Sequence, residues 1–177
     1  MIKSSLPQLC LLRHAKSAWD APLSGDHERP LAPRGRDAAP RIGQEMRRRG
    51  LSPDLVLCST ATRARETLEL VLKSLGSTPE IRFDRRIYDA GTHELIDLIS
   101  EFGTEVSQLL VVGHNPAMQI TASVLSHTGD EEALLRLETK FPSAGLAILA
   151  FGDENWTKAD LADGRLEAFV TPRSLTT

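Results

Sequence analysis

The sequence has 177 residues, with 21 Lys and Arg against 24 Asp and Glu, and a formal net charge of −3. Hydrophobic residues make up 41% and charged residues 25%, as in ordinary soluble globular proteins, which excludes a disordered, collagen-like or membrane-embedded chain. The slightly acidic balance argues against binding of nucleic acid or anionic membranes through a basic face. The length predicts a single domain over residues 1–177.

The cysteines and the first residues of the chain indicate an intracellular setting. Cys10 and Cys58 both lie in apolar runs and are too few for a disulfide framework, so we expect reduced, buried thiols. No run of 18 apolar residues is present, and the N-terminal stretch lacks the apolar segment of a signal peptide. The predicted location is therefore cytoplasmic.

Short apolar runs alternate with stretches of helical periodicity along the chain. Pro40 lies inside the first predicted helix and indicates either a later start or a kink there. The alternation predicts an α/β fold, a three-layer sandwich with a mostly parallel central sheet and helices on both faces. In chain order, the pattern predicts a strand at 9–12, an irregular segment at 17–33, a helix at about 34–49, a strand at 55–58, a helix at 62–75, a strand at 80–83, a helix at 92–102, a strand at 109–112, a helix from 116 to about 126 capped by Asn115, and strands at 145–151 and 166–171.

Polar residues follow three of these strands directly. In parallel sheets the ligand site lies beyond the carboxyl ends of the strands, so these residues are expected to converge. No phosphate-binding glycine loop and no H-x-H or H-E-x-x-H spacing is present, so neither a nucleotide site nor a metal site is predicted. The converging residues are Arg13, His14, the segment 59–63, His114 and Asn115.

Histidine and arginine together suit phosphoryl chemistry. An unprotonated imidazole can attack phosphorus, and nearby arginines disfavour the imidazolium while binding phosphate oxygens through two parallel hydrogen bonds. Arg13 and His14 are neighbours, so both can serve one pocket only if the strand ends or bends there. Each residue also has a plainer interpretation, a hydrogen-bonded core histidine or a surface ion pair. Cys58 and Arg63 are separated by four residues, whereas cysteine phosphatases need five, so Cys58 is interpreted as a buried strand-end residue.

Three segments, taken in order, resemble the motifs of a known family. The sequence L-L-R-H-A-K-S-A-W-D at 11–20 resembles the R-H-G signature of the histidine phosphatase superfamily, which has the phosphoglycerate-mutase-like fold. S-T-A-T-R-A-R-E-T at 59–67 and V-G-H-N-P at 112–116 resemble its second and third motifs. The short length and the segment E-R-P-L-A-P-R-G at 28–35 resemble the SixA-type phosphohistidine phosphatase branch, which lacks the covering insertion of larger members.

The resemblance implies a role for each matching residue. His14 is the nucleophile that becomes phosphohistidine, while Arg13, Arg63 and His114 bind the phosphoryl group and complete the catalytic set. Arg29 adds a fourth substrate contact. No metal and no organic cofactor is implied.

The sequence departs from the family pattern at three points. Ala15 replaces the glycine that usually follows the catalytic histidine. Asp20 stands where mutase-like relatives have a phosphate-contacting asparagine, so Asp20 is expected to point away or to have another role. The general acid of larger members has its nearest counterpart in Asp89, with Glu94 and Asp26 as further candidates.

The expected function is that of a metal-independent phosphatase working through a covalent phosphohistidine. The expected partner is a phosphorylated substrate, foremost a phosphohistidine-bearing protein, with no nucleic acid and no membrane. An uncertain general acid favours that substrate, because a phosphoramidate leaving group is easier to expel than an alkoxide. A small-molecule phosphomonoesterase of the same fold and a non-catalytic phosphate-binding module remain alternatives.

Overall fold

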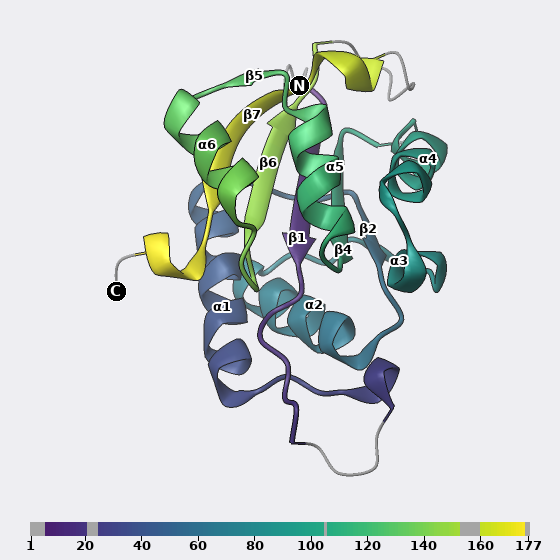
Figure 1. Ribbon diagram of the computed structural model, residues 1–177, viewed down its shortest axis with the longest axis vertical. Helices are drawn as coiled ribbons and strands as arrows, with labels where there is room; N and C mark the ends of the chain where they lie inside the picture. Colours follow the sequence, from purple (N-terminus) through teal and green to yellow (C-terminus); the bar gives the residue numbers. More distant parts are fainter. Residues whose placement is uncertain (1–5, 21–24, 105, 153–159, 176–177) are drawn as a thin grey trace.

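The computed structural model describes residues 6–20, 25–104, 106–152 and 160–175, arranged around a seven-stranded sheet of order β3-β2-β4-β1-β6-β7-β5 (Figure 1). The strands are β1 (Gln8–Arg13), β2 (Leu55–Cys58), β3 (Glu80–Phe83), β4 (Gln108–Gly113), β5 (Thr128–Gly129), β6 (Leu146–Ala150) and β7 (Arg165–Val170). The helices are α1 (Pro33–Arg48), α2 (Thr62–Leu75), α3 (Arg86–Asp89), α4 (Thr92–Gly103), α5 (Ala117–Leu125) and α6 (Glu131–Thr139), with 3₁₀ turns η1 (Asp26–Glu28), η2 (Asp160–Asp163) and η3 (Pro172–Ser174).

The sheet is mostly parallel, as predicted. Strands β3, β2, β4 and β1 pair in parallel, and β5 pairs in parallel with β7. Strand β6 runs antiparallel to both β1 and β7. The carboxyl ends of β1, β2 and β4 therefore meet at one edge of the sheet.

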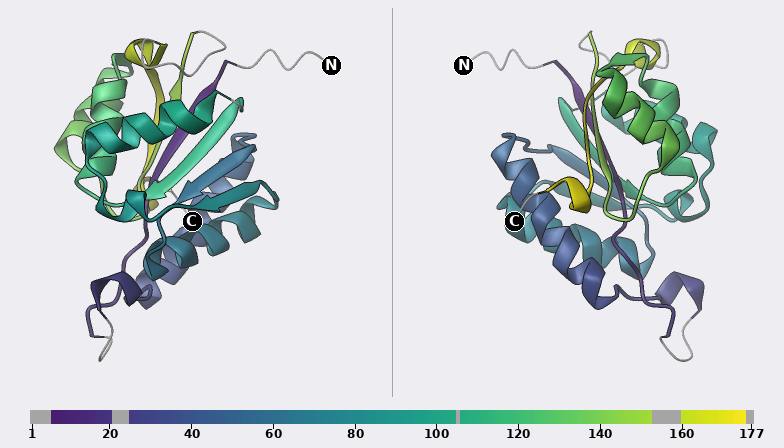
Figure 2. Two further views of the ribbon diagram at one scale, coloured as in Figure 1. Left: turned by 90° about the vertical axis from the view of Figure 1, so that its right-hand side faces the viewer. Right: turned by 60° about the vertical axis from the view of Figure 1, so that its left-hand side comes forward.

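The alternation of side chains along the central strands divides the core into two layers. On β1, Leu9 and Leu11 pack with α4 and α5, while Cys10 and Leu12 pack with α1 and α2. Figure 2 shows the blue helices α1 and α2 on one side of the sheet and the teal and green helices on the other. This confirms the predicted three-layer sandwich. Within the described ranges, no helix combines the length and apolar character needed to cross a membrane.

The structure settles two details of the predicted helices. Helix α1 matches the predicted range of about 34–49, and its start at Pro33, where proline suits the first helical turn, excludes the alternative of a later start after Pro40. Helix α5 has Pro116 at its cap position, whereas Asn115 was the predicted cap. The Asn115 side chain instead reaches one turn into the helix, where its Oδ1 accepts from Gln119 N at 3.3 Å.

Helices α1 and α2 pack closely because a glycine lies between them. A Cβ placed on Gly43 would lie 2.3 Å from the carbonyl oxygen of Val71, so only glycine permits this approach of the two backbones. Helix α2 buries Ala64, Leu68 and Val71 on its inner face, and this packing fixes the first turn of the helix at the sheet edge.

Replacing Gly43 with alanine should destabilise the protein by about 1–3 kcal/mol, since the added methyl group forces the two helices apart. Urea unfolding followed by circular dichroism measures the change. The matched control is Gly152→Ala, where an added Cβ meets nothing within 4 Å. Equal unfolding midpoints for the two variants would contradict this packing.

Candidate active site

The carboxyl ends of β1 and β4 bring two histidines together. Arg13 pairs with Gly113 in register, and the His14 backbone N–H donates to the Gly113 carbonyl at 3.0 Å. His114 directly follows Gly113, and the centroids of the two imidazole rings lie 5.1 Å apart. The predicted convergence at this edge of the sheet is thus observed in the positions of His14 and His114.

The His14 ring is buried and held in one orientation. Its Nδ1 lies 2.7 Å from the carbonyl oxygen of Ala15, which can only accept, so Nδ1 carries the proton and Nε2 keeps its lone pair. The Nε2 atom faces Arg63 Nε at 3.4 Å. Burial, reinforced by His114, Arg63 and Arg13, lowers the pKa of His14 to about 3. The ring is therefore neutral at physiological pH, with a free nitrogen facing a cation.

Arg63, in the first turn of α2, is the buried centre of the hydrogen-bond network. Its Nη2 lies 3.4 Å from Nδ1 of His114, its Nη1 donates to the Asp26 carbonyl at 2.7 Å, and Nη2 also binds Asp26 Oδ2 at 3.1 Å. Thr67, one turn along, fixes this helix to the β1 loop, because its hydroxyl donates to the Arg63 carbonyl and accepts from Ala15 N. A buried guanidinium is thereby supplied with partners.

His114 is held between Arg63 and the end of β2. Its Nε2 lies 2.7 Å from Ser59 Oγ, and since Arg63 can only donate, Nδ1 is the accepting nitrogen in this arrangement. The Ser59 hydroxyl can donate as well as accept, so it can serve either tautomer of the ring. Burial and the neighbouring Arg63 lower the pKa of His114 to about 4, although Asp26 opposes the shift.

Strand β1 ends at Arg13. The strand end is what the sequence analysis required for Arg13 and its neighbour His14 to serve one pocket. Arg13 Nη1 donates to the Phe141 carbonyl at 2.8 Å. Its buried Nε has no hydrogen-bond partner among the described residues. Burial lowers the pKa of the guanidinium below its ordinary value.

Arg29 joins the site through Asp26 rather than through the histidines. Its Nε donates to Asp26 Oδ1 at 3.0 Å, and its Nη1 donates to Ser17 Oγ at 2.9 Å. The guanidinium also stacks 3.7 Å from the ring centre of the exposed Trp19. Asp20 is exposed, at the last described residue before the gap at 21–24.

The three candidate acids occupy different places. Asp89 is exposed at the end of α3 and makes no hydrogen bond to the histidines or arginines of the site within the described chain. Glu94 accepts the backbone N–H of Gly91 at 3.0 Å and so caps α4. Asp26 binds Arg63 and Arg29, and the Tyr88 hydroxyl donates to its Oδ2 at 2.6 Å. Of the three carboxylates, only Asp26 is joined to the histidine and arginine cluster.

Two residues next to the site, Tyr88 and His27, were not predicted from the sequence. Tyr88 lies in α3, one residue before Asp89, and its ring meets the His114 ring edge-on with centroids 5.4 Å apart. His27, in η1, packs edge-on against Tyr88 at 4.8 Å and contacts Thr60 Oγ1 at 2.8 Å. The I-Y-D tripeptide at 87–89 was the only sequence signal, and it pointed to the adjacent carboxylate.

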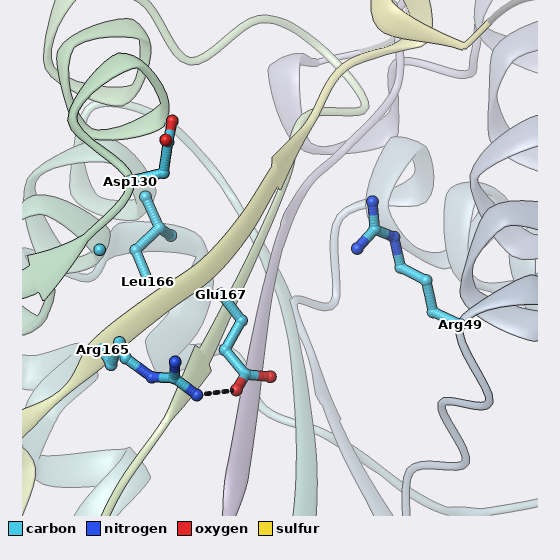
Figure 3. Close-up of a pocket in the computed structure, with 6 residues that line it drawn as sticks. Arg49, Asp130, Arg165, Leu166 and Glu167 are labelled. Carbon is cyan, nitrogen blue, oxygen red and sulfur yellow. Dashed lines mark hydrogen bonds and ion pairs between the residues drawn. The ribbon is translucent and has the colours of Figure 1, made fainter.

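The described residues offer neither a metal centre nor a second site of comparable chemistry. No group of three or more His, Cys, Asp or Glu side chains gathers within the described ranges as metal ligands would. Burial raises the pKa of the Cys58 thiol, as expected of a core cysteine. A surface pocket near the start of β7 is distant from the histidines, because Arg165 pairs with Ala150 on β6, which pairs with Gln8 at the opposite end of β1. Its lining residues, drawn in Figure 3, are Arg49, Gly129, Asp130, Arg165, Leu166 and Glu167.

Comparison with known proteins identifies the family. The sequence profile of the histidine phosphatase superfamily (branch 1) matches residues 9–94. An uncharacterised protein of Mycobacterium tuberculosis is 38% identical over 92% of this chain and 100% of its own. The chain belongs to the histidine phosphatase superfamily.

Solved structures of superfamily members extend this to the SixA-type branch. A protein assigned as phosphohistidine phosphatase SixA from Agrobacterium tumefaciens is 33% identical, with a TM-score of 0.79 over 96% of this chain and 100% of that one. A second protein with the same assignment, from Nakamurella multipartitia, is 30% identical, with a TM-score of 0.81 over 96% and 98% of the two chains. The phosphoglycerate-mutase-like fold of this histidine phosphatase chain is thereby confirmed.

The low pKa values of His14 and His114 predict that acid lowers the stability of the protein. Both folded-state pKa values, about 3 for His14 and about 4 for His114, lie below the value of about 6.5 in an unfolded chain. The unfolded state therefore binds more protons below about pH 6.5, so the free energy of unfolding should fall as the pH is lowered from 6.5 towards 3. Nuclear magnetic resonance of the imidazole nitrogens should show His14 still neutral at pH 5. A His14 titration midpoint near 6.5 would contradict the burial described.

Proposed function

We propose that this superfamily member is a phosphatase in which His14 attacks phosphorus and carries the phosphoryl group, and that its substrate is phosphohistidine on a protein. The observation that carries the proposal is the His14 Nε2 lone pair, which is fixed by Ala15 and faces the buried Arg63. A neutral, oriented imidazole is the form that can act as a nucleophile.

In the first step, the Nε2 lone pair of His14 forms a bond to phosphorus. The bond from phosphorus to the leaving atom breaks, and its electron pair departs with the leaving group. Arg13, Arg63 and His114 stabilise the charge on the phosphoryl oxygens. The unpaired Nε–H of Arg13 supports this role, because a phosphoryl oxygen would give it the acceptor that the described residues do not provide. Arg29, which binds the same Asp26 carboxylate as Arg63, adds a third positive charge and a fourth substrate contact.

In the second step, water attacks the phosphorylated His14. The phosphorus–nitrogen bond breaks, its electrons return to Nε2, and a proton leaves to solvent as inorganic phosphate forms. Tautomer exchange at His114 replaces the bond that Nδ1 accepts from Arg63 with one that Nδ1 donates to a phosphoryl oxygen, while the Ser59 hydroxyl turns to donate to Nε2.

The state of Asp26 supports a phosphoramidate substrate. The hydrogen bond from Tyr88, with those from Arg63 and Arg29, lowers the pKa of Asp26 to about 2, so this carboxylate is ionised and holds no proton for a leaving group. An imidazole leaves phosphorus more readily than an alkoxide and needs less protonation. The assignment of the two similar structures as SixA supports the same substrate.

Substituting His14 with alanine should abolish turnover of p-nitrophenyl phosphate, with a fall in kcat of more than about 1000-fold, because the covalent route is lost. The matched control is His93→Ala, which removes an exposed histidine on α4. Full activity in the His14 variant would refute the proposed nucleophile. Tight phosphate binding by a wild-type protein without turnover would indicate a phosphate-binding module instead.

Substrate preference is tested by comparing kcat/KM for a phosphohistidine protein with values for a panel of sugar and nucleotide phosphates. We expect the phosphohistidine protein to exceed every panel member by at least about 10-fold, equivalent to about 1.4 kcal/mol. A phosphomonoester with the higher value would replace phosphohistidine as the substrate class.

A further inference from the structure

We propose that Asp26 is a positioning residue, which holds one edge of the Arg63 guanidinium so that the adjacent edge presents its donors to a phosphoryl group on His14. The inference rests on the proposed function of His14 and Arg63. It gives a role to a carboxylate that, as an anion, would otherwise oppose phosphate binding.

The geometry of Arg63 separates two sets of donors. The guanidinium is a planar fork with five N–H groups in fixed directions. Its end, Nη1 and Nη2, binds Asp26 through the carbonyl oxygen at 2.7 Å and Oδ2 at 3.1 Å. Its side, Nε and Nη2, faces His14 Nε2 and His114 Nδ1, each at 3.4 Å. A phosphoryl group bonded to His14 Nε2 would meet the side of the fork, so it and Asp26 need not compete for the same donors.

The distances on the two edges differ in the direction that this role requires. The two contacts with Asp26 fall in the range of good hydrogen bonds, whereas the two 3.4 Å contacts with the histidines are long for N–H donors. The Asp26 edge is thus the anchored one. The edge that faces the histidines has donors that a phosphoryl oxygen can take over at little cost.

Asp26 is itself fixed from two further directions. The Tyr88 hydroxyl donates to the same Oδ2 at 2.6 Å, and Arg29 binds Oδ1 through Nε and Nη2, both at 3.0 Å. Arg29 is in turn held by Ser17 and by stacking on Trp19. A carboxylate with charge-assisted bonds on both oxygens is well placed to orient a buried arginine, although its own side chain is 52% exposed.

The effect of Asp26→Asn on phosphate binding distinguishes a residue that positions Arg63 from an anion that opposes phosphate. Asp26→Asn removes one negative charge beside an anion site, so simple electrostatics would strengthen phosphate binding. If Asp26 positions Arg63, the same variant loosens the fork and weakens binding. The two accounts therefore predict opposite signs.

The experiment measures inorganic phosphate binding calorimetrically and p-nitrophenyl phosphate turnover for wild type, Asp26→Asn and Tyr88→Phe. Positioning predicts that Asp26→Asn raises the Kd for phosphate about 10-fold and lowers kcat, with Asp26→Glu recovering part of both. Tyr88→Phe should shift both in the same direction by a smaller factor, because it removes one of the bonds that orient Asp26. The charge-matched control is Asp37→Asn, which removes an exposed carboxylate from α1.

Phosphate binding that tightens in Asp26→Asn would overturn the proposal and make Asp26 a competing anion. Unchanged binding and turnover would overturn it too, leaving Asp26 as a surface ion pair. Failure of the proposed function gives a different pattern. Either the wild-type protein does not turn over the ester, or the His14→Ala variant turns it over at the wild-type rate. Thermal unfolding of each variant separates a local effect from a loss of folding.

Discussion

The buried guanidinium of Arg63 is the interaction on which the site depends. A positive charge taken out of water is costly unless its donors are met, and here they are met by the two histidines and by Asp26. The same charge disfavours protonation of both imidazoles, so a single side chain links His14, His114 and Asp26. The position of Arg63 follows from the packing of α2 against α1 and the sheet. This packing places the first turn of α2 at the edge where the parallel strands end.

The parallel topology explains how distant residues reach this guanidinium. Strand β4 lies between β1 and β2, so the residues that follow these three strands become neighbours without any long connection. The two residues before antiparallel β6 add a second support, because the Gly145 carbonyl accepts from Arg13 N and the Ala144 N–H donates to the His14 carbonyl. The backbone of His14 is thereby held on both sides.

Much of this could be predicted from the sequence, for physical reasons. Short apolar runs such as 109–112 favour buried strands because they are too short for a helix, and the rules for parallel sheets then place Arg13, His14 and His114 at one edge. The alternating faces of β1 and the stripe on α2 follow from side-chain periodicity alone. Helix α6, with its Asp130 cap, was overlooked although its signal is present in the sequence.

The contacts of Asp26 could not be predicted in this way. Asp26 is 37 positions from Arg63 and 62 from Tyr88. Asp26 lies in a short 3₁₀ turn and Tyr88 in a one-turn helix, and neither has a periodic pattern in the sequence. The sequence offered Asp89, Glu94 and Asp26 as candidate acids without ranking their contacts. Only the three-dimensional structure distinguishes a carboxylate that caps a helix from one that binds an arginine.

The most direct test of the account is to trap the phosphorylated protein and map the modified residue. Rapid quenching under alkaline conditions during turnover of a phosphohistidine protein, followed by mass spectrometry of peptides, identifies the acceptor. The account predicts one phosphoryl group per chain, on His14. A phosphoryl group on another residue, or turnover without any covalent species, would contradict it.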